Sequence, residues 1–592
     1  MKNTSCLKAV FLGTACAIAA VSSAFAASFN IAPGDLASAL NAYTEQSGVS
    51  LIVSGDAVRG VRTSGVRGAL DSDEALSRLL SGTGFVMSRR ATGAVTITRD
   101  QHSELQSFQI AQATAATPHA VETVTVTSSK LGGGDVQSIP ISITALSQEQ
   151  LTASQTNGGP DLIKQVPNMT FTKTNFSGYS IQLRGIGTQA ISVTTDPAVA
   201  VAFNDQPFIR NHFFEQEFFD VAQVQVLRGP QGTLYGRNAT AGVVNITSAK
   251  PTDQFEAMAS AELGNFKQKR FEGMINLPIV DDRLALRLAG EWTKRDGYTK
   301  NRITDDNVDG RNLWSGRATL GWKPSEAFQS HLIWEHFSED DDRMRSNKQL
   351  CHTAPTPTQV GGQSTANIPG STGLFGGLNS YLSQGCQMGS LYDDGAYGVP
   401  DPNSLPYYFV LSTFRSGVLP YADTRQSTNL REIDTQLTPV YKAKSDTVQW
   451  NNVYKVTPSL TFTSDTGFSN DFLWSTGDYN RFASNSGIFR HITGGNEVGS
   501  AQGMFEWNPE TQTTFICDPQ LGCSDRLLAE DLVRQHSWQA NQEFRLASSF
   551  SGPFNFSVGG NYMHYETVED YYVFINSMTA FSWIFSGQGA GD

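Results

Sequence analysis

The segment from Asp220 to Pro251 combines glycines with arginines, and this combination could form a loop that binds an anion. Its glycines allow sharp backbone turns, and its arginines place cations beside those turns. The G-x-x-x-x-G-K-[ST] spacing of a phosphate-binding loop does not occur in it, so we expect no phosphate loop here. Apolar residues alternate before the turns and recur after them, which predicts a strand on each side. The turn residues are Arg228, Gly229, Gly232, Gly236, Arg237 and Gly242.

Residue patterns for covalent catalysis do not occur in the rest of the sequence. We find no Ser/His/Asp order, no H-E-x-x-H and no cofactor fingerprint, and the nine histidines are scattered. We therefore expect a protein that is not an enzyme, with no catalytic residues, no cofactor and no resident metal.

The first 26 residues have the features of a secretory signal peptide. Lys2 and Lys8 precede an apolar run at 9–20, and Ala24-Phe25-Ala26 fits the small-residue cleavage pattern. A membrane anchor is the alternative, but the run is too short to span a bilayer comfortably. The sequence therefore predicts an exported chain with residues 1–26 as its signal peptide.

Four cysteines follow the signal peptide. An even number in an exported chain favours disulfides, and closeness in the sequence suggests that Cys351 pairs with Cys386 and Cys517 with Cys523. Cys351 and His352 are an alternative start for a metal site, but no matching set of Cys or His accompanies them.

Composition favours a β-rich protein with many turns. Of 592 residues only 17% are charged, 10% are aromatic and 54 are glycine. The net charge of -13 and the absence of a basic stripe exclude a nucleic-acid partner. No segment after the signal peptide has ~18 consecutive apolar residues, so any membrane span must consist of strands.

Residues 28–99 carry one pattern twice and predict a small α+β domain. In each half an extended stretch leads into a helix with apolar residues at helical spacing, and a strand follows. Asp71 and Glu74 have capping-box spacing at the start of the second helix. The apolar helix residues are expected to form the core; they are Leu36, Leu40, Tyr43, Leu76, Leu79 and Leu80.

Residues 100–120 are small, polar and aperiodic, which predicts a flexible linker with a reach of roughly 60–70 Å. Residues 121–127 then alternate β-branched side chains and predict a strand without a neighbour in the sequence. Such a strand is suited to addition at the sheet edge of a partner protein. An ordinary edge strand of the following domain is the alternative.

The run VQVLRGPQGTLYGRNATAGVVNIT at 224–247 closely resembles the most recognisable segment of the plug domain of TonB-dependent outer-membrane receptors. Other stretches between 138 and 251 are similar to further elements of such an α/β plug. Residues 28–99 resemble the short N-terminal domain shared by secretins and by signal-transducing members of this family. The chain departs from the family pattern at Gln225, where glutamate is usual, so a charge network at that position is in doubt.

Period-two alternation dominates residues 255–592, as in Phe554, Phe556 and Val558, and gives one face for lipid and one for a wet lumen. Short turns alternate with long insertions at roughly 340–430 and 475–530, as in outer-membrane barrels. We expect an antiparallel transmembrane β-barrel that is incomplete, with about 9–10 strands where the family has about 22. The chain is thus expected to be the N-terminal part of a longer, multidomain receptor.

The resemblance implies roles for particular residues. Residues 122–126 are similar to the TonB box, and Arg184 and Arg228 match plug arginines that meet carboxylates of the barrel wall. The aromatic and cationic stretch at 207–220 occupies the place of a ligand-facing loop, although such clusters are core in most soluble proteins. The TonB-box residues are Glu122, Thr123, Val124, Thr125 and Val126, and the ligand-contact candidates are Tyr179, Gln189, Arg210, His212, Phe213 and Phe214.

The function that the resemblance implies is active uptake of an iron siderophore or another iron chelate across the outer membrane. Ligand would expose the TonB box to the C-terminal domain of TonB in the inner-membrane energising complex. Residues 28–99 would lie in the periplasm and contact an anti-sigma regulator, and outer-membrane lipid would surround the barrel. The alternatives are a receptor for a carbohydrate or cobalamin, a secretin-like channel, and a truncated receptor that does not transport.

Overall fold

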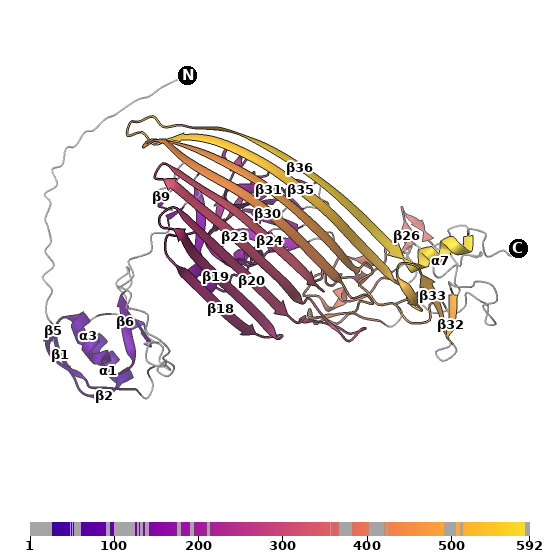
Figure 1. The fold of residues 1–592 in the computed structure, drawn as a ribbon. Coiled ribbons are helices and arrows are strands. Elements are labelled where there is room, and N and C mark those ends of the chain that lie inside the picture. Colours follow the sequence, from indigo (N-terminus) through magenta and orange to yellow (C-terminus); the bar gives the residue numbers. More distant parts are fainter. Residues whose placement is uncertain are drawn as a thin grey trace, which may run out of the picture. The chain divides into compact units, whose positions relative to one another are not determined.

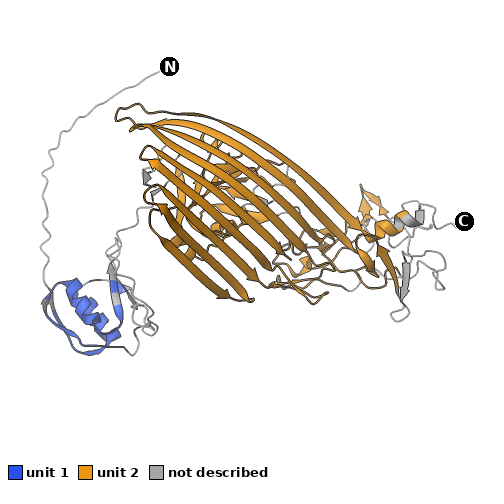
Figure 2. Cartoon of the chain, viewed as in Figure 1, with its two compact units in different colours: residues 1–121 blue, residues 122–592 orange. Residues whose placement is uncertain are grey.

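The computed structural model describes residues 27–47, 49, 51–52, 58, 61–89, 95–99, 125–126, 130, 134–135, 141–173, 179–189, 195–209, 214–355, 357–365, 382–401, 420–421, 424–489, 505–508 and 513–585. The predicted signal peptide and linker lie outside these residues. The chain divides into two compact units, Met1–Val121 and Glu122–Asp592 (Figure 2), and each has a hydrophobic core of its own.

The first unit packs helices α1 (Leu36–Ser47) and α3 (Ser72–Leu80) together with short β-strands (Figure 1). The six residues predicted to form its core are all buried. Strand β1 pairs with β5, β2 with β4, and β7 lies between β3 and β6. The strands are β1 (Ala27–Ile31), β2 (Gly34–Asp35), β3 (Leu51–Ile52), β4 (Arg62–Thr63), β5 (Val66–Leu70), β6 (Phe85–Arg89) and β7 (Val95–Arg99).

Helix α3 starts with half of the predicted capping box. The side chain of Asp71 accepts a hydrogen bond from the backbone N–H of Asp73, which satisfies one of the unpaired donors of the first turn. Glu74 does not reach back to Asp71, because its carboxylate pairs with Arg78 at 2.7 Å, one turn further along the helix.

The second unit contains a plug region, residues 125–251, built on a mixed five-stranded sheet in the order β10-β16-β17-β14-β15. Strands β14 and β17 are parallel, and the other pairs are antiparallel. A smaller sheet, β11-β12-β13, completes its core. The elements are β10 (Ser142–Ser147), α4 (Gln148–Ala153), η3 (Gly159–Lys164), β11 (Met169–Lys173), β12 (Tyr179–Leu183), β13 (Ile186–Gly187), β14 (Val199–Phe203), β15 (Gln206–Phe208), β16 (Val221–Arg228), α5 (Gly232–Tyr235) and β17 (Gly242–Ser248).

The glycine and arginine segment recognised in the sequence forms the β16–β17 hairpin. Gly242 begins β17 with φ +157°, and a Cβ atom there would lie 2.3 Å from the Leu227 carbonyl oxygen, so only glycine fits. Gln225 is fully buried in β16, where its amide donates to Gln223. The residue that departs from the family pattern therefore takes part in a neutral contact inside the plug.

Among the described residues, nine long strands form one antiparallel sheet, here called the large sheet, in which sequence neighbours lie side by side (Figure 1). They are 9 to 20 residues long, well above the ~5–6 residues usual in globular proteins. The strands are β18 (Glu256–Gly264), β19 (Gln268–Val280), β20 (Leu284–Arg295), β23 (Arg311–Ser325), β24 (Phe328–Asp341), β30 (Val440–Thr457), β31 (Leu460–Asp478), β35 (Ala529–Ser548) and β36 (Ser557–Ile575). Helix α7 (Asn576–Phe585) follows β36.

The two ends of the large sheet differ. Turns at one end are short, as at 281–283 and 458–459, whereas the other end has one short turn, 265–267, and three long connections, 296–310, 342–439 and 479–528. We call the latter the long-loop end. The two long insertions expected from the sequence fall there.

The two faces of the large sheet differ as well. Polar residues such as Gln449 and Gln539 are buried and contact the plug region. Trp314, Trp334 and Trp450 are 47%, 49% and 51% exposed, respectively, so apolar rings project to solvent elsewhere on the sheet. Among the described residues, no helix is long and apolar enough to cross a membrane.

Candidate functional site

Residues 214–220, here called the acidic segment, connect β15 to β16 and carry three carboxylates. Phe214 and Phe218 are buried in the plug core, so the segment is anchored to the plug by its aromatic rings. Its acidic side chains, Glu215, Glu217 and Asp220, contact the large sheet and the residues that follow β24. The acidic segment therefore joins the plug region to the large sheet.

Asp220 is held by two arginines of the large sheet. Its carboxylate accepts two hydrogen bonds from Arg287 of β20, at 2.6 and 2.9 Å, and both side chains are buried. Arg317 of β23 donates to the carbonyl oxygens of Phe219 and Asp220 and lies 4.4 Å over the Phe219 ring. A two-pronged ion pair with both partners enclosed fixes position and direction together.

Glu217 is held by β19 and β20. Its carboxylate accepts from Nε of Arg270 at 3.2 Å and from the Thr293 hydroxyl at 2.8 Å. Arg270 also donates to the Phe218 carbonyl oxygen at 2.9 Å and contacts Glu291 at 3.3 Å. One guanidinium thus bridges the acidic segment and the wall of the large sheet.

Glu215 is shared between two cations from different parts of the chain. Arg343, just beyond β24, donates to its Oε2 at 2.9 Å, and Lys173, at the end of β11, lies 2.8 Å from its Oε1. Arg343 also pairs with Glu339 at 2.9 Å, which in turn pairs with Arg311 at 2.7 Å. These groups form a chain of alternating charges at the long-loop end.

The pKa values of two plug residues reflect this arrangement. Burial alone would raise the pKa of Glu215, but the charges of Arg343 and Lys173 outweigh it and lower the pKa to about 2. Burial lowers the pKa of Lys173, and Arg343 and Arg311 lower it further, whereas Glu215 raises it. Both pKa values are therefore lowered, Glu215 because its cationic neighbours outweigh burial, and Lys173 because burial and two other cations outweigh its single carboxylate partner.

A cavity of about 530 Å³ lies beside Glu215, between the plug region and the long-loop end. Its wall carries five cations, four carboxylates and the rings of Phe171 and Tyr298. The charged groups are Lys173, Arg295, Arg311, Arg343, Arg345, Asp161, Glu215, Glu217 and Asp309. A cavity of this size and polarity suits a small polar ligand.

The long connections are tied to one another beside this cavity. Strand β21 (Thr299–Asn301) pairs with β29 (Glu432–Ile433), and Arg302 contacts Asp434 twice at 2.6 Å. Arg345 makes a two-pronged ion pair with Asp531 of β35, at 2.7 and 3.0 Å. The connections therefore form a linked cap at the long-loop end.

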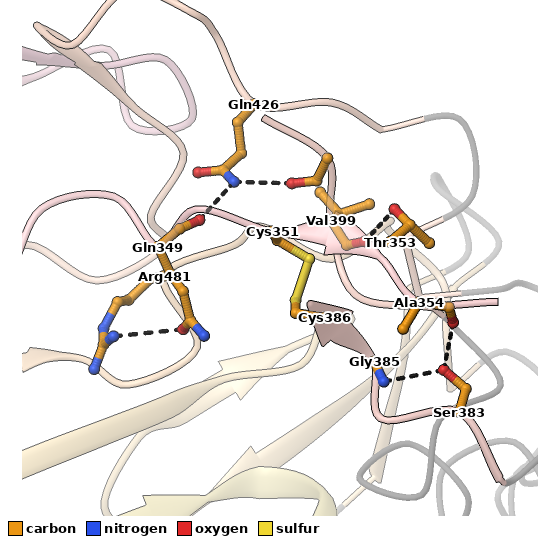
Figure 3. The surroundings of a disulfide bond; sticks show 11 residues. Gln349, Cys351, Thr353, Ala354, Ser383, Gly385, Cys386, Val399, Gln426 and Arg481 are labelled. Carbon is orange, nitrogen blue, oxygen red and sulfur yellow. Dashed lines mark hydrogen bonds between the residues drawn. A yellow bond between two sulfur atoms is a disulfide. The ribbon is translucent and has the colours of Figure 1, made fainter. Parts of the chain in front are cut away.

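Figure 3 shows the disulfide between Cys351 and Cys386 inside this cap. Near it, Gln426 donates to the carbonyl oxygens of Gln349 and Gly398 at 2.8 Å each. A second disulfide joins Cys517 of β33 (Thr513–Asp518) to Cys523 of β34 (Gly522–Ser524).

The alternative of a metal site at Cys351 and His352 finds no support. Cys351 is in the disulfide, and His352 hydrogen-bonds Asp393 at 2.8 Å. Among the described residues, no cluster of three or more His, Cys, Asp or Glu side chains could hold a metal ion.

The end of the predicted TonB box lies in a short hairpin. Strand β8 (Thr125–Val126) pairs antiparallel with β9 (Gly134–Asp135). Glu122, Thr123 and Val124 lie outside the described residues. Between the strands, Lys130 is buried, and its ammonium group lies 2.7 Å from Glu543 of β35 and 5.1 Å over the Tyr235 ring.

The two predicted plug arginines are placed differently from the arginines just described. Arg228 donates to Thr144 within the plug at 3.2 Å, and Arg184 is exposed with φ +55°. Within the described ranges neither makes an ion pair, so their contact with wall carboxylates stays a prediction. The ion pairs of the acidic segment with the large sheet and Arg343 have the opposite sense, because the plug supplies the carboxylates there. Lys130 and Glu543 have the predicted sense, with the cation on the plug and the carboxylate on the large sheet.

Of the predicted ligand-contact residues, Phe214 and Gln189 have side chains that the structure describes. Phe214 is fully buried and packs at 5.5 Å on Phe171, so it belongs to the plug core, the alternative given for this aromatic cluster. Gln189 is exposed and follows β13. Tyr179 begins β12, and its side chain, like Arg210, His212 and Phe213, lies outside the described residues.

Comparison with known proteins gives the class to which the plug region belongs. Residues 135–243 match the TonB-dependent Receptor Plug Domain family. The chain therefore carries a TonB-dependent receptor plug domain, and this family consists of transport receptors rather than enzymes.

Its relatives by sequence include two receptors for ferric pyoverdine, an iron-regulated outer membrane virulence protein and a pesticin receptor. The chain is 25% identical to the ferric-pyoverdine 358 receptor of Pseudomonas putida over 283 residues, 45% of this chain and 34% of that protein. It is 31% identical to the pesticin receptor of Yersinia pestis over 206 residues, 34% of this chain and 30% of that protein. The chain thus spans about a third of the length of these relatives.

Solved structures of siderophore receptors also match. The siderophore receptor PiuA from Acinetobacter baumannii matches at 12% identity with a TM-score of 0.46, covering 74% of this chain and 47% of that chain. The ferripyoverdine receptor of the outer membrane of Pseudomonas aeruginosa matches at 12% identity with a TM-score of 0.37, covering 93% of this chain and 66% of that chain.

The sequence interpretation missed the acidic segment and the arginines that bind it. A signal was present, because three carboxylates among four aromatic and amide residues cannot all be buried without cationic partners. The partners themselves, Arg270, Arg287, Arg317 and Arg343, lie 50 to 130 residues away and form no local pattern.

Proposed function

We propose that this chain belongs to a TonB-dependent outer-membrane receptor that takes up an iron siderophore or another iron chelate. The observation that carries the proposal is the plug domain itself, bound to the large sheet through the acidic segment. Two of its relatives are receptors for ferric pyoverdine, which supports iron as the cargo.

The contacts of the acidic segment suit a plug that must stay closed at rest and move under force. They are ion pairs, hydrogen bonds and one cation–π contact, all of them non-covalent. Ion pairs with strict geometry hold their position well, yet they separate one after another when the chain is pulled. The pull would reach the plug from its N-terminal side, where the predicted TonB box lies.

The cavity beside Glu215 is the proposed ligand site. It is lined by the plug, by the large sheet and by the residues after β24, so a bound ligand would touch all three. The long-loop end would face the outside of the cell, as the alternation of short turns and long loops in outer-membrane proteins implies. A bound ligand would then contact Glu215 and Lys173 of the plug directly.

The test is iron uptake by iron-starved Gram-negative cells that lack their own siderophore receptors and express the full chain. We expect accumulation of radioactive iron from at least one chelate, and none in matched cells without TonB or with residues 122–126 deleted. Equal uptake with and without TonB would overturn the proposal. Uptake of a carbohydrate or cobalamin in place of iron would assign a non-iron nutrient.

We also propose that residues 28–99 signal to an anti-sigma regulator from the periplasm. Support comes from their compact fold, which has a hydrophobic core of its own and belongs to a different unit of the chain from the plug. Deletion of residues 28–99 is expected to abolish ligand-dependent transcription from a reporter of the regulator while leaving iron uptake intact. Loss of uptake together with the reporter signal would contradict a separate signalling role.

A further inference from the structure

The cavity beside Glu215 is lined by arginines with donor groups that no described residue pairs. Arg295 makes no ion pair within the described part of the chain. Its Nη2 donates to the Asp309 carbonyl oxygen at 2.7 Å, and its guanidinium lies 4.7 Å over the Tyr298 ring. The buried Nε–H groups of Arg295 and Arg343 have no hydrogen-bond partner among the residues that the structure describes. Buried donors without acceptors are rare, because each costs free energy that an acceptor would recover.

These donors lie among further cations. Arg295 ends β20, Arg311 begins β23, Arg343 follows β24 and Lys173 ends β11, so four separate elements contribute positive charge to one cavity. The ring of Tyr441 lies 3.8 Å from the Arg343 guanidinium and supports its flat face. The orientation of this guanidinium is therefore fixed before a ligand arrives.

We propose that the cavity binds an anionic iron chelate, whose oxygens accept from Arg295 and Arg343 and replace Glu215 as the partner of Lys173 and Arg343. This inference rests on the proposed function, and it names the charge class of the ligand and the plug residue that responds to it. Carboxylate and catecholate oxygens share the required chemistry.

The replacement of Glu215 couples occupancy to the plug. Glu215 is one of three acidic side chains through which the acidic segment contacts the large sheet and the residues after β24. An anion that binds Arg343 and Lys173 breaks the ion pairs of these two residues with Glu215. The ion pairs of Glu217 and Asp220 stay in place. The bound plug is then held by fewer ion pairs, at the end where the ligand sits. A low pKa keeps Glu215 ionised, so the competition is between two anions.

The test is equilibrium binding of three ferric chelates to outer membranes from cells that express the full chain. Two of the chelates are anionic: ferric citrate, which is a hydroxycarboxylate complex, and a tris-catecholate complex. The third is a neutral trihydroxamate complex. Wild type is expected to prefer at least one anionic chelate over the neutral one by about tenfold or more. The variant Arg295→Gln is expected to lose that preference, whereas Lys442→Gln, whose ion pair is exposed, keeps it.

The variant Glu215→Gln distinguishes competition from a structural role. Competition predicts tighter binding of the anionic chelate, by about tenfold, because Lys173 and Arg343 no longer have an anion to release. A structural role predicts weaker binding of every chelate. Should Glu215→Gln fail to insert into the membrane, Lys173→Gln serves instead and is expected to weaken anionic binding alone.

The outcomes separate this inference from the proposed function. If wild type binds no iron chelate, the proposed function is overturned, and this inference with it. If wild type binds the neutral chelate as tightly as the anionic ones, or if Arg295→Gln weakens all three equally, only the inference is overturned.

Discussion

The ammonium group of Lys130 lies 2.7 Å from Oε2 of Glu543, although 413 residues separate them in the sequence. The lysine side chain is 2% exposed, and it also lies over the ring of Tyr235, whose hydroxyl donates to Asp205 at 3.0 Å. A lysine enclosed this completely is held by its charge partner, because burial without one is costly. Lys130 thus anchors the chain between β8 and β9 to the large sheet and to the plug.

The first prediction is that Lys130→Met frees the predicted TonB box. Removal of the charge leaves Glu543 without its lysine, and the β8–β9 hairpin has only two residue pairs to hold it. We expect residues 122–126 to be cut by added protease at least several times faster in Lys130→Met than in wild type, measured on membranes opened to the periplasmic side. The control is Lys164→Met, which removes an exposed lysine of the same plug. Equal cleavage in wild type and Lys130→Met would show that the ion pair does not restrain the segment.

The second prediction concerns Asp220 and Arg287. Arg287→Gln leaves a buried carboxylate unpaired and is expected to lower the free energy of unfolding by about 3–5 kcal/mol. Asp220→Asn is expected to cost less, about 1–3 kcal/mol, because Arg287 keeps Glu256 at 3.3 Å. Asparagine also tolerates the φ of +46° at this position.

Denaturant unfolding of the purified chain in detergent measures both effects. The double variant Asp220→Asn with Arg287→Gln replaces the ion pair by two amides and is expected to be more stable than Arg287→Gln alone. Lys442→Met, whose ion pair with Asp340 is exposed, is the control and is expected to change stability by less than about 1 kcal/mol. A double variant no more stable than Arg287→Gln would show that the pair does not act as a unit.

The third prediction is a pH dependence set by Glu215. Its pKa is about 2 in the folded protein against 4.5 ordinarily, so the folded state binds this proton less tightly than the unfolded state does. The stabilisation is therefore complete above about pH 4.5 and is lost as the pH falls towards 2. Its full size is roughly 3 kcal/mol, from about 1.4 kcal/mol for each pKa unit.

Thermal unfolding of wild type and Glu215→Gln between pH 6 and pH 2 tests this. We expect a constant difference in melting temperature above pH 5, which then shrinks towards zero at the acid end. Glu326→Gln changes a glutamate that is 89% exposed and whose pKa Lys323 also lowers; it should show a much smaller convergence, because solvent screens that ion pair. A Glu215→Gln difference that persists unchanged to pH 2 would contradict the assignment.

Much of the fold follows from local pattern. Alternation of apolar and polar residues identifies a strand and its two faces, and helical spacing in 28–99 identified the core positions that are buried. The short strands of the loops are different. Lys300 pairs with Glu432 across 132 residues of sequence, in strands of two or three residues. A segment that short has no period to detect, so its partner is set by tertiary packing.

The residues of the site were harder to predict from the sequence than the fold. Family resemblance pointed to arginines of the plug, whereas the ion pairs between the acidic segment and the large sheet use arginines of that sheet, such as Arg287, and carboxylates of the plug. Alternation shows that Arg287 faces inward, but it cannot show that Asp220 is its partner. Pairing depends on how the plug sits against the wall, which only the folded chain determines.

The fourth prediction compares the two disulfides. Cys351–Cys386 closes a loop of 35 residues and Cys517–Cys523 one of 6. Loop-closure entropy gives about 4 kcal/mol for the longer loop and about 2 kcal/mol for the shorter one, relative to the reduced chains.

Cys351 is also fully buried with Val399, Tyr421 and Phe482, so the longer loop anchors the cap over the cavity. We therefore expect Cys351→Ala with Cys386→Ala to increase proteolysis within 342–439 and to weaken chelate binding. The matched pair Cys517→Ala with Cys523→Ala should affect only its own hairpin. Limited proteolysis with mass spectrometry, run beside chelate binding on the same membranes, separates the two effects. If both pairs of substitutions alter binding equally, order in the whole cap rather than in the 342–439 connection controls access to the cavity.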